Sequence, residues 1–304
     1  MRTQVPTFVV AGAARAGTTA VIESLRHHPD VFVSQPKEPH YLAFAGSAPA
    51  FTGPGDDATI NRVSVTDLDA YLRLFPSAGE HQVVGEGSVS TLYYHEEAIP
   101  RLRDLNSDVR VVIILREPVA RAYSSHQYLR NRGFEPLPDF LDAVDAEPVR
   151  ASNGWHHLWH YTSMSMYADA VEAFVSELGT EQVGVWWYDH LRDNPATCLE
   201  SIHSFVGVPQ SAVAGPAVGK VNASGRPRRP WLQAAIHEAS RHDRLRSALK
   251  QVVPFGLREH IRNSNLRPGE IPYAARNVLA DRFAADLDKL ERILGRPVPE
   301  GWRL

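Results

Sequence analysis

Short apolar runs alternate along much of the chain with segments whose apolar residues recur at helical spacing. The apolar runs predict five strands, at residues 7–11, 30–34, 82–86, 109–115 and 182–188. The helical spacing predicts helices at residues 18–28, 67–75, 96–105, 118–132, 137–144, 162–178 and 195–206. The run at 109–115 is apolar almost throughout, which is typical of a central strand covered on both faces. The alternation predicts an α/β fold, with a parallel sheet of about five strands flanked by helices.

The alternation ends near residue 208. Residues 207–230 are rich in Gly, Pro and basic residues and predict a long loop, followed by helices near 231–251 and 274–294. Gly, Pro and Asp are also frequent in residues 45–65, which predicts a mobile surface segment. No linker separates two strand-rich halves, so we expect a single domain over residues 1–304, with a helical C-terminal part from residue 231.

Composition narrows the class of protein. Hydrophobic residues make up 43% and charged residues 22% of the chain, as in soluble globular proteins. The net charge of -3 gives no electrostatic reason to expect a nucleic-acid partner or a membrane-surface partner. The single cysteine, Cys198, excludes an intramolecular disulfide, and the sequence contains no recognisable signal peptide or membrane span. We therefore expect a cytoplasmic protein.

The first predicted strand leads into the sequence GAARAGTT at residues 12–19 and then into a helix. Small residues let backbone N–H groups point at an anion, and the helix N-terminus adds partial positive charge. The alternative is a tight turn that only packs the helix on the sheet. A Walker loop has lysine where Thr18 stands, and the strand at 109–115 is followed by Arg116 rather than ending in an aspartate. These differences disfavour a magnesium-dependent kinase or ATPase.

A second candidate anion site follows the central strand. Arg116 lies where open α/β folds place ligand contacts, and Ser124 falls about two turns into the next helix. A guanidinium and a hydroxyl that face one pocket suit a phosphate monoester. The alternative is that Arg116 and Arg121 are ordinary surface or capping charges.

Four motifs together resemble the sulfotransferases that use 3′-phosphoadenosine-5′-phosphosulfate (PAPS), on the side of the heparan and other carbohydrate enzymes. They are GAARAGTT at 12–19, PKEPHYL at 36–42, GEGSVSTLYY at 85–94 and LREPVARAYSSHQY at 115–128. Segments 189–208 and 221–228 are also similar to that family, so the resemblance covers most of the chain.

The resemblance implies a P-loop-like fold in which PAPS is the cofactor, adenosine 3′,5′-bisphosphate (PAP) the product, and no metal is required. It implies that the 5′-phosphosulfate is bound by the loop residues Arg15, Ala16, Gly17, Thr18 and Thr19. It assigns the 3′-phosphate to Arg116 and Ser124. The family commonly has lysine in place of Arg15, so binding is a firmer expectation for Arg15 than catalysis.

The resemblance also implies a reacting centre after the second strand. There Glu38 is the base for the acceptor hydroxyl, His40 is the alternative base, and Lys37 stabilises charge or binds the acceptor. From the residues alone, the alternative is that Lys37 and Glu38 form a solvated ion pair on a loop, with no catalytic role. Glu86 orients the acceptor, holds Lys37 or has a purely structural role.

The remaining candidates are weaker. Arg226 or Arg228 is a candidate for a further 3′-phosphate contact, in a late loop at 208–230 that also carries Lys220 and that the family folds over the nucleotide. His156 and His160 lie four apart on a predicted helix, which is the spacing of a metal pair, although no H-E-x-x-H pattern accompanies them. An aromatic cluster either stacks on a ligand or belongs to the core: Trp155, Trp159, Tyr161 and Tyr167.

The expected activity is transfer of the sulfuryl group of PAPS to a hydroxyl of a carbohydrate, glycolipid or small natural product. The heparan enzymes often have lysine and proline where this chain has Gly87 and Val89, which argues against a polyanionic acceptor. Two alternatives stay open, a magnesium-dependent P-loop kinase-like enzyme and a nucleotide-binding module without catalysis. The sequence does not predict the oligomeric state.

Overall fold

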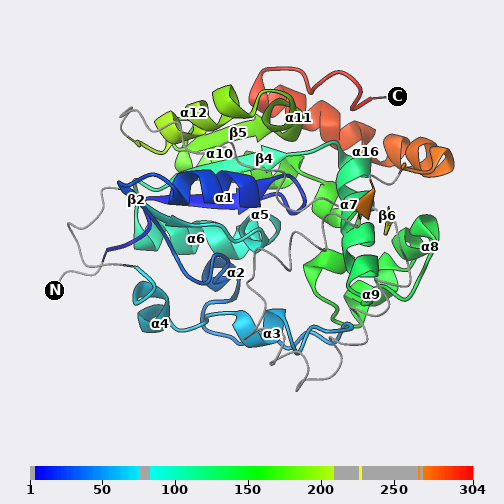
Figure 1. The fold of residues 1–304 in the computed structure, drawn as a ribbon, viewed down its shortest axis with the longest axis horizontal. Helices are drawn as coiled ribbons and strands as arrows, with labels where there is room; N and C mark the ends of the chain where they lie inside the picture. Colours follow the sequence, from blue (N-terminus) through cyan, green and yellow to red (C-terminus); the bar gives the residue numbers. More distant parts are fainter. Residues whose placement is uncertain (1–3, 76–82, 209–225, 228–265, 268–269, 304) are drawn as a thin grey trace.

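Five parallel strands form one sheet in the order β2-β3-β1-β4-β5 (Figure 1). The computed structural model describes residues 4–75, 83–208, 226–227, 266–267 and 270–303. The strands are β1 (Phe8–Gly12), β2 (Val31–Val33), β3 (Val83–Glu86), β4 (Arg110–Leu115) and β5 (Val183–Trp187). Each lies within a predicted strand or differs from it by one residue at its end, so the predicted parallel α/β fold is confirmed.

Most predicted helices in the described residues are present. They are α1 (Thr18–Arg26), α4 (Leu68–Leu72), α6 (His95–Leu105), α7 (Pro118–Asn131), α8 (Phe140–Asp145), α10 (Ala168–Leu178), α12 (Pro195–Phe205) and α16 (Tyr273–Leu294). The structure adds five short helices, α2 (Tyr41–Phe44), α3 (Ile60–Val63), α5 (Ser90–Tyr93), α9 (Glu147–Ser152) and α11 (Tyr188–Asp193). These have four to six residues, too few for helical periodicity to be visible in a sequence.

The helix predicted from residue 162 was placed too early. Two 3-10 turns, η1 (His157–Trp159) and η2 (Ser163–Ser165), come before α10, which begins only at Ala168. Asp286 on α16 accepts hydrogen bonds from the backbone N–H groups of Tyr167 and Ala168, at 2.9 and 3.0 Å. A distant carboxylate therefore caps the start of α10, and local periodicity carries no information about it.

The order of the strands brings the candidate segments together. β1 lies between β3 and β4, and the N–H of Ala13 continues this pairing by donating to the carbonyl of Ile114 at 2.7 Å. The carboxyl ends of β1, β3 and β4 therefore meet at one edge of the sheet, where open α/β folds bind ligands. The phosphate loop, Glu86 and Arg116 all follow these strand ends.

The core has two parts. The larger covers both faces of the sheet, with β1 and most of β4 completely buried. The smaller packs α7 and α8 against η1 and α16, and Figure 1 shows α7 and α8 beside one end of the sheet. Trp159 and Tyr161 belong to the smaller part and Tyr167 to the larger, so the core interpretation holds for these three aromatic residues.

The C-terminal part is described only in pieces. The helix predicted at 274–294 is confirmed as α16, and a two-residue strand β6 (Arg226–Pro227) pairs with β7 (Leu266–Arg267). The helix predicted near 231–251 lies outside the described residues.

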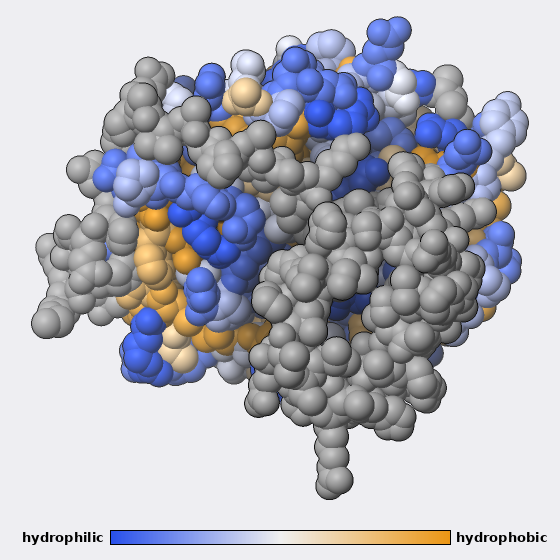
Figure 2. All heavy atoms as spheres, viewed as in Figure 1, coloured by the Kyte–Doolittle hydropathy of each residue, from blue (hydrophilic) through white to orange (hydrophobic). Residues whose placement is uncertain are grey.

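Hydrophilic residues cover most of the coloured upper rim of the face in Figure 2, and hydrophobic residues gather at its lower left. Among the described helices, none has both the length and the apolar character needed to cross a membrane.

Candidate active site

The loop between β1 and α1 has the backbone geometry of an anion-binding loop. Gly17 is the N-cap of α1 and takes a φ of 90°, and a Cβ at this position would lie 2.8 Å from Cδ2 of Leu191. Glycine is therefore needed both for the turn and for the close packing. No side chain caps α1, so backbone N–H groups at its N-terminus are suited to an incoming anion.

Arg15 turns back from this loop into the protein. Its Nε donates to Oγ of Ser124 on α7 at 3.3 Å, and its guanidinium lies over the ring of Tyr128, 4.5 Å from the centroid. Burial, together with the positive charges of Arg116 and Arg132, lowers the pKa of Arg15 to about 10. The group is still charged at neutral pH, but its charge is held where water screens it poorly.

Arg116 joins the two predicted anion sites. Its Nη1 donates to the carbonyl of Arg15 at 2.9 Å, and its guanidinium lies over the ring of Tyr188, 4.7 Å from the centroid. Its own carbonyl accepts a hydrogen bond from the hydroxyl of Tyr167 at 2.8 Å. Arg15, Arg116 and Ser124 therefore form one cluster, although they come from two segments a hundred residues apart in the chain.

The cluster has the chemistry of a phosphate site. Among the described residues, no carboxylate forms an ion pair with Arg15 or Arg116. Both arginines are half-buried, and a charge that has lost part of its water without a counter-ion is stabilised by a bound anion. Arg121, by contrast, is completely buried and donates to Ser165 Oγ and to the carbonyl of Tyr161, both at 2.6 Å. Its role is therefore structural rather than that of a surface charge.

Lys37 and Glu38 lie beside the loop. Lys37 Nζ donates to Glu38 Oε1 at 2.8 Å and to Thr19 Oγ1 at 3.3 Å, which places this ammonium between the loop and the carboxylate. Burial raises the pKa of Glu38, but the charge of Lys37 and its hydrogen bond, with His40 adding to them when it is protonated, outweigh burial and leave that pKa below its usual value. Glu38 is therefore ionised at neutral pH, and its side chain is 32% exposed, so a proton donor can reach it.

His40 faces Glu38 from the other side. Its Nε2 lies 3.9 Å from Glu38 Oε2, and its Nδ1 shares a hydrogen bond of 2.8 Å with Ser90 Oγ. Burial lowers the pKa of His40, which favours the neutral imidazole. The φ of 59° is unusual for a residue other than glycine, and a hydrogen bond of 3.0 Å from its N–H to Ser88 Oγ holds this conformation.

Glu86 is joined to His40 through Ser88, whose hydroxyl oxygen accepts the hydrogen bond from the N–H of His40. It is completely buried, and its Oε2 accepts a hydrogen bond from the hydroxyl of Ser88 at 2.6 Å. Burial raises the pKa of Glu86 to about 7. Glu86 does not line the cavity described next.

A cavity of about 360 Å³ opens next to Glu38 and His40. Its walls come from α7 and the residues after it, from η1, and from the segment between α2 and α4. The lining residues include Pro54, Ile60, Val89, Leu129, Phe134 and Leu158. Glu38 and His40 therefore stand between the anion-binding loop and a separate chamber, as a base must when it serves two substrates.

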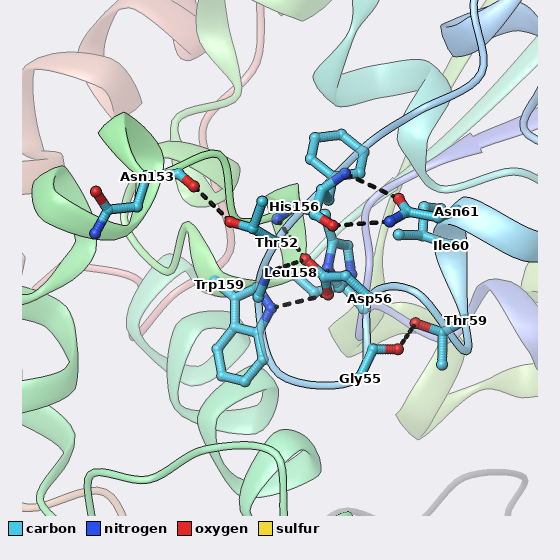
Figure 3. Close-up of polar contacts among 12 residues, drawn as sticks. Thr52, Gly55, Asp56, Thr59, Ile60, Asn61, Asn153, His156, Leu158 and Trp159 are labelled. Atoms are coloured by element: carbon cyan, nitrogen blue, oxygen red, sulfur yellow. Dashed lines mark hydrogen bonds and ion pairs between the residues drawn. The ribbon is translucent and has the colours of Figure 1, made fainter.

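The prediction that residues 45–65 are a mobile surface segment is wrong for its central part. Asp56 is 1% exposed, and its carboxylate accepts hydrogen bonds from the N–H of Gly53 at 2.9 Å and from Trp159 Nε1 at 3.4 Å. It also pairs with Nδ1 of His156 at 2.6 Å (Figure 3). Composition correctly indicated a loop, but one buried ion pair fixes it against η1.

The metal pair considered for His156 and His160 is not formed. The two residues flank a single 3-10 turn rather than lying on one α-helix, and they turn to different partners. His156 pairs with Asp56, and His160 Nδ1 shares a hydrogen bond of 2.7 Å with the hydroxyl of Tyr93. Within the described residues no group of three or more His, Cys, Asp or Glu side chains is arranged to hold a metal ion.

Sequence reasoning located the loop, Glu38 and Arg116 but missed several neighbours. Ser88 and Ser90 lie in the GEGSVSTLYY segment, but in that segment only Glu86 was predicted as a site residue. Tyr128 on α7 and Arg132 at its C-cap follow Ser124 at intervals of four, which places them on the same side of the helix. This spacing was the signal that could have found them. Among the late-loop candidates, Lys220, Arg228 and the side chain of Arg226 lie outside what the structure describes.

The fold defines a class of protein, an α/β protein with a glycine-rich loop between the first strand and helix and with Lys37, Glu38 and His40 beside that loop. The chain belongs to the sulfotransferase family, because the Sulfotransferase domain model matches residues 6–218. A solved sulfotransferase from Alicyclobacillus acidocaldarius is similar over 99% of this chain and 100% of its own, with a TM-score of 0.76 and 27% identity.

Two curated relatives give more distant similarities. Mouse heparan sulfate glucosamine 3-O-sulfotransferase 3A1 is 24% identical over 235 residues, which are 74% of this chain and 54% of that protein. Human bifunctional heparan sulfate N-deacetylase/N-sulfotransferase 3 is 25% identical over 211 residues, which are 67% of this chain and 22% of that protein. The chain spans about half the length of the 3-O-sulfotransferase.

Proposed function

We propose that this protein transfers the sulfuryl group of PAPS to a hydroxyl of a small-molecule or glycan acceptor. The observation that supports it best is the cluster of Arg15, Arg116 and Ser124, whose two half-buried guanidinium groups have no carboxylate partner among the described residues. Two anionic groups at the two ends of one nucleotide match this cluster. Membership of the sulfotransferase family agrees with this interpretation.

The loop residues and the residues after β4 are assigned to different groups of the nucleotide. Arg15 and the N-terminus of α1, with Gly17, Thr18 and Thr19, are assigned to the 5′-phosphosulfate. Arg116 and Ser124 are assigned to the 3′-phosphate. None of these contacts needs a magnesium ion, because the positive charge of the arginines takes the place that the metal and lysine have in a Walker loop.

Bound PAPS supplies a sulfuryl group on a phosphate leaving group. Glu38 is ionised and reaches the cavity, so it takes the proton of the acceptor hydroxyl as that oxygen approaches in line. Lys37 is held between Thr19 and Glu38, where its charge stabilises negative charge that develops beside the loop. His40, whose pKa is lowered by burial, lies 3.9 Å from Glu38 and is the alternative base.

Transfer of labelled sulfate from PAPS to a panel of sugars, phenols and aliphatic alcohols tests this function. Glu38→Gln keeps the shape of the side chain but removes the base. We expect kcat to fall about 100-fold or more, since general-base catalysis typically contributes that much, while the affinity for PAP changes less than about threefold. Unchanged turnover in the variant would remove Glu38 as the base, and His40→Gln then tests the alternative.

A further inference from the structure

The cavity beside Glu38 is lined largely by apolar side chains. They come from three separate segments and surround about 360 Å³. This volume lies near the small end of the range of roughly 300–1,000 Å³ that is typical of small-molecule sites. A sugar brings several hydroxyl groups that lose water on binding and need hydrogen-bond partners in return. The apolar walls of Ile60, Leu129 and Phe134 do not supply them. Among the polar residues of the lining, Asp56 and His156 already bond to each other, at 2.6 Å, so the cavity favours an acceptor with an apolar body.

Two arginines interrupt these apolar walls. Arg132 is half-buried and lies over the ring of Tyr128 at 4.5 Å from the centroid, and Arg62 is exposed at the rim. Nε of Arg132 is buried and has no hydrogen-bond partner in the structure. Among the described residues neither arginine forms an ion pair. The cavity therefore holds positive charge that is not compensated locally.

The acidic residues of the same cavity do not neutralise these arginines. Asp56 is turned to His156, at 2.6 Å, and Glu38 is turned to Lys37, at 2.8 Å. Tyr128 is in contact with both Arg132 and Arg15, each 4.5 Å from its ring, so the cation of the cavity sits close to the anion-binding loop. A ligand that fills the cavity can thus place an anionic group on Arg132 and a hydroxyl near Glu38.

Among the described residues that line the cavity, Arg62 and Arg132 are the only arginines and there is no lysine. A Cβ at Gly87 would meet Cγ1 of Ile22 at 2.7 Å, so a side chain at this position would displace Ile22. Lys37 is already engaged by Glu38 and Thr19. The charge in the cavity suits one anionic group rather than a series of them.

We propose that the acceptor is a small amphipathic hydroxy acid, an inference that rests on the proposed function. Its apolar body fills the cavity, its carboxylate or other single anionic group binds Arg132, and its hydroxyl reaches Glu38. Sulfuryl transfer then forms a bond between that hydroxyl oxygen and sulfur, breaks the bond from sulfur to the phosphate oxygen, and leaves PAP as product, with the hydroxyl proton on Glu38.

Matched pairs of probes test this inference. The acids are 8-hydroxyoctanoate and 3-(4-hydroxyphenyl)propanoate, and the neutral partners are octan-1-ol and 4-propylphenol. Calorimetry on the full chain saturated with PAP measures binding without requiring turnover, and labelled-sulfate transfer is then measured with the same probes. We expect at least one acid to bind at least tenfold more tightly than its neutral partner, as a charge-assisted contact with arginine predicts.

Variants test whether Arg132 causes the preference for the acid over its neutral partner. Arg132→Gln should abolish the preference for the acid and leave the affinity for PAP within about threefold, and Arg132→Lys should keep part of the preference. Arg103→Gln is the matched control, because Arg103 is exposed and pairs with Glu177 away from the cavity. If no acid binds more tightly than its neutral partner, or if Arg132→Gln retains the preference, the inference is overturned. Failure of the wild-type protein to bind PAP would instead contradict the proposed function.

Discussion

Nε of Arg15 lies 3.3 Å from Oγ of Ser124, and this hydrogen bond joins the loop after β1 to the helix after β4. The contact unites two segments that the sequence presents as separate anion sites. Arg116 reinforces it from the strand end, through its hydrogen bond of 2.9 Å to the carbonyl of Arg15. The hydrogen bonds join the three residues into one unit, so a change at one position should affect how the others bind the proposed anionic ligand.

Replacement of Arg15 tests the charge of the loop. Arg15→Gln removes a half-buried cation that no carboxylate neutralises in the described structure, so the affinity for PAP should fall at least tenfold in calorimetry. Arg15→Lys should lose less, because it keeps the charge and gives up only the fork of donors. An affinity for PAP that Arg15→Gln leaves unchanged would show that the 5′-phosphate binds elsewhere.

Replacement of Arg116 tests the assignment of the 3′-phosphate. The wild-type protein should bind PAP more tightly than adenosine 5′-phosphate, which lacks that group. In Arg116→Gln the ratio of the two dissociation constants should fall at least tenfold, because only PAP loses a contact. Arg103→Gln serves as the control. An equal loss for both nucleotides would assign Arg116 to the support of the loop alone.

Glu86 provides a prediction about the dependence of stability on pH. Its pKa in the folded protein is about 7, above the ordinary value of 4.5. Between these two values the folded state binds more protons than the unfolded state, so the stability that Glu86 contributes is complete below pH 4.5 and is lost as the pH rises through 7. Glu86→Gln carries no such penalty, so it should gain stability relative to the wild type as the pH rises.

Urea denaturation of both proteins at pH 5 and at pH 8 measures this difference. The free energy of unfolding of Glu86→Gln, relative to the wild type, should be higher at pH 8 than at pH 5 by up to about 3 kcal/mol. All other titrating groups are shared by the two proteins and cancel. The same difference at both pH values would mean that Glu86 does not titrate in this range.

The sheet was predictable because buried parallel strands leave long apolar runs, such as the one that forms β4. The phosphate loop and Arg116 were predictable because each directly follows a strand. The serines that hold His40 and Glu86 were not, since a hydroxyl between two small residues carries no signal until the chain is folded.

Residues 45–65 show why composition fails for loops. Their content of Gly, Pro and Asp indicates turns, but Asp56 fixes the segment through His156, 100 residues later. The start of α10 depends in the same way on Asp286, more than 100 residues away. Such long-range pairs decide which loops are held in place, and the local sequence contains only one partner of each pair.

The most direct test of the central claim is isothermal titration calorimetry with PAP and with ATP. Both titrations are made with EDTA present, and the ATP titration is repeated with excess magnesium. We predict that PAP binds without magnesium and at least tenfold more tightly than ATP under either condition, because Arg116 and Ser124 recognise a 3′-phosphate that ATP lacks. Tighter binding of ATP with magnesium than of PAP would contradict this account and favour a kinase-like enzyme.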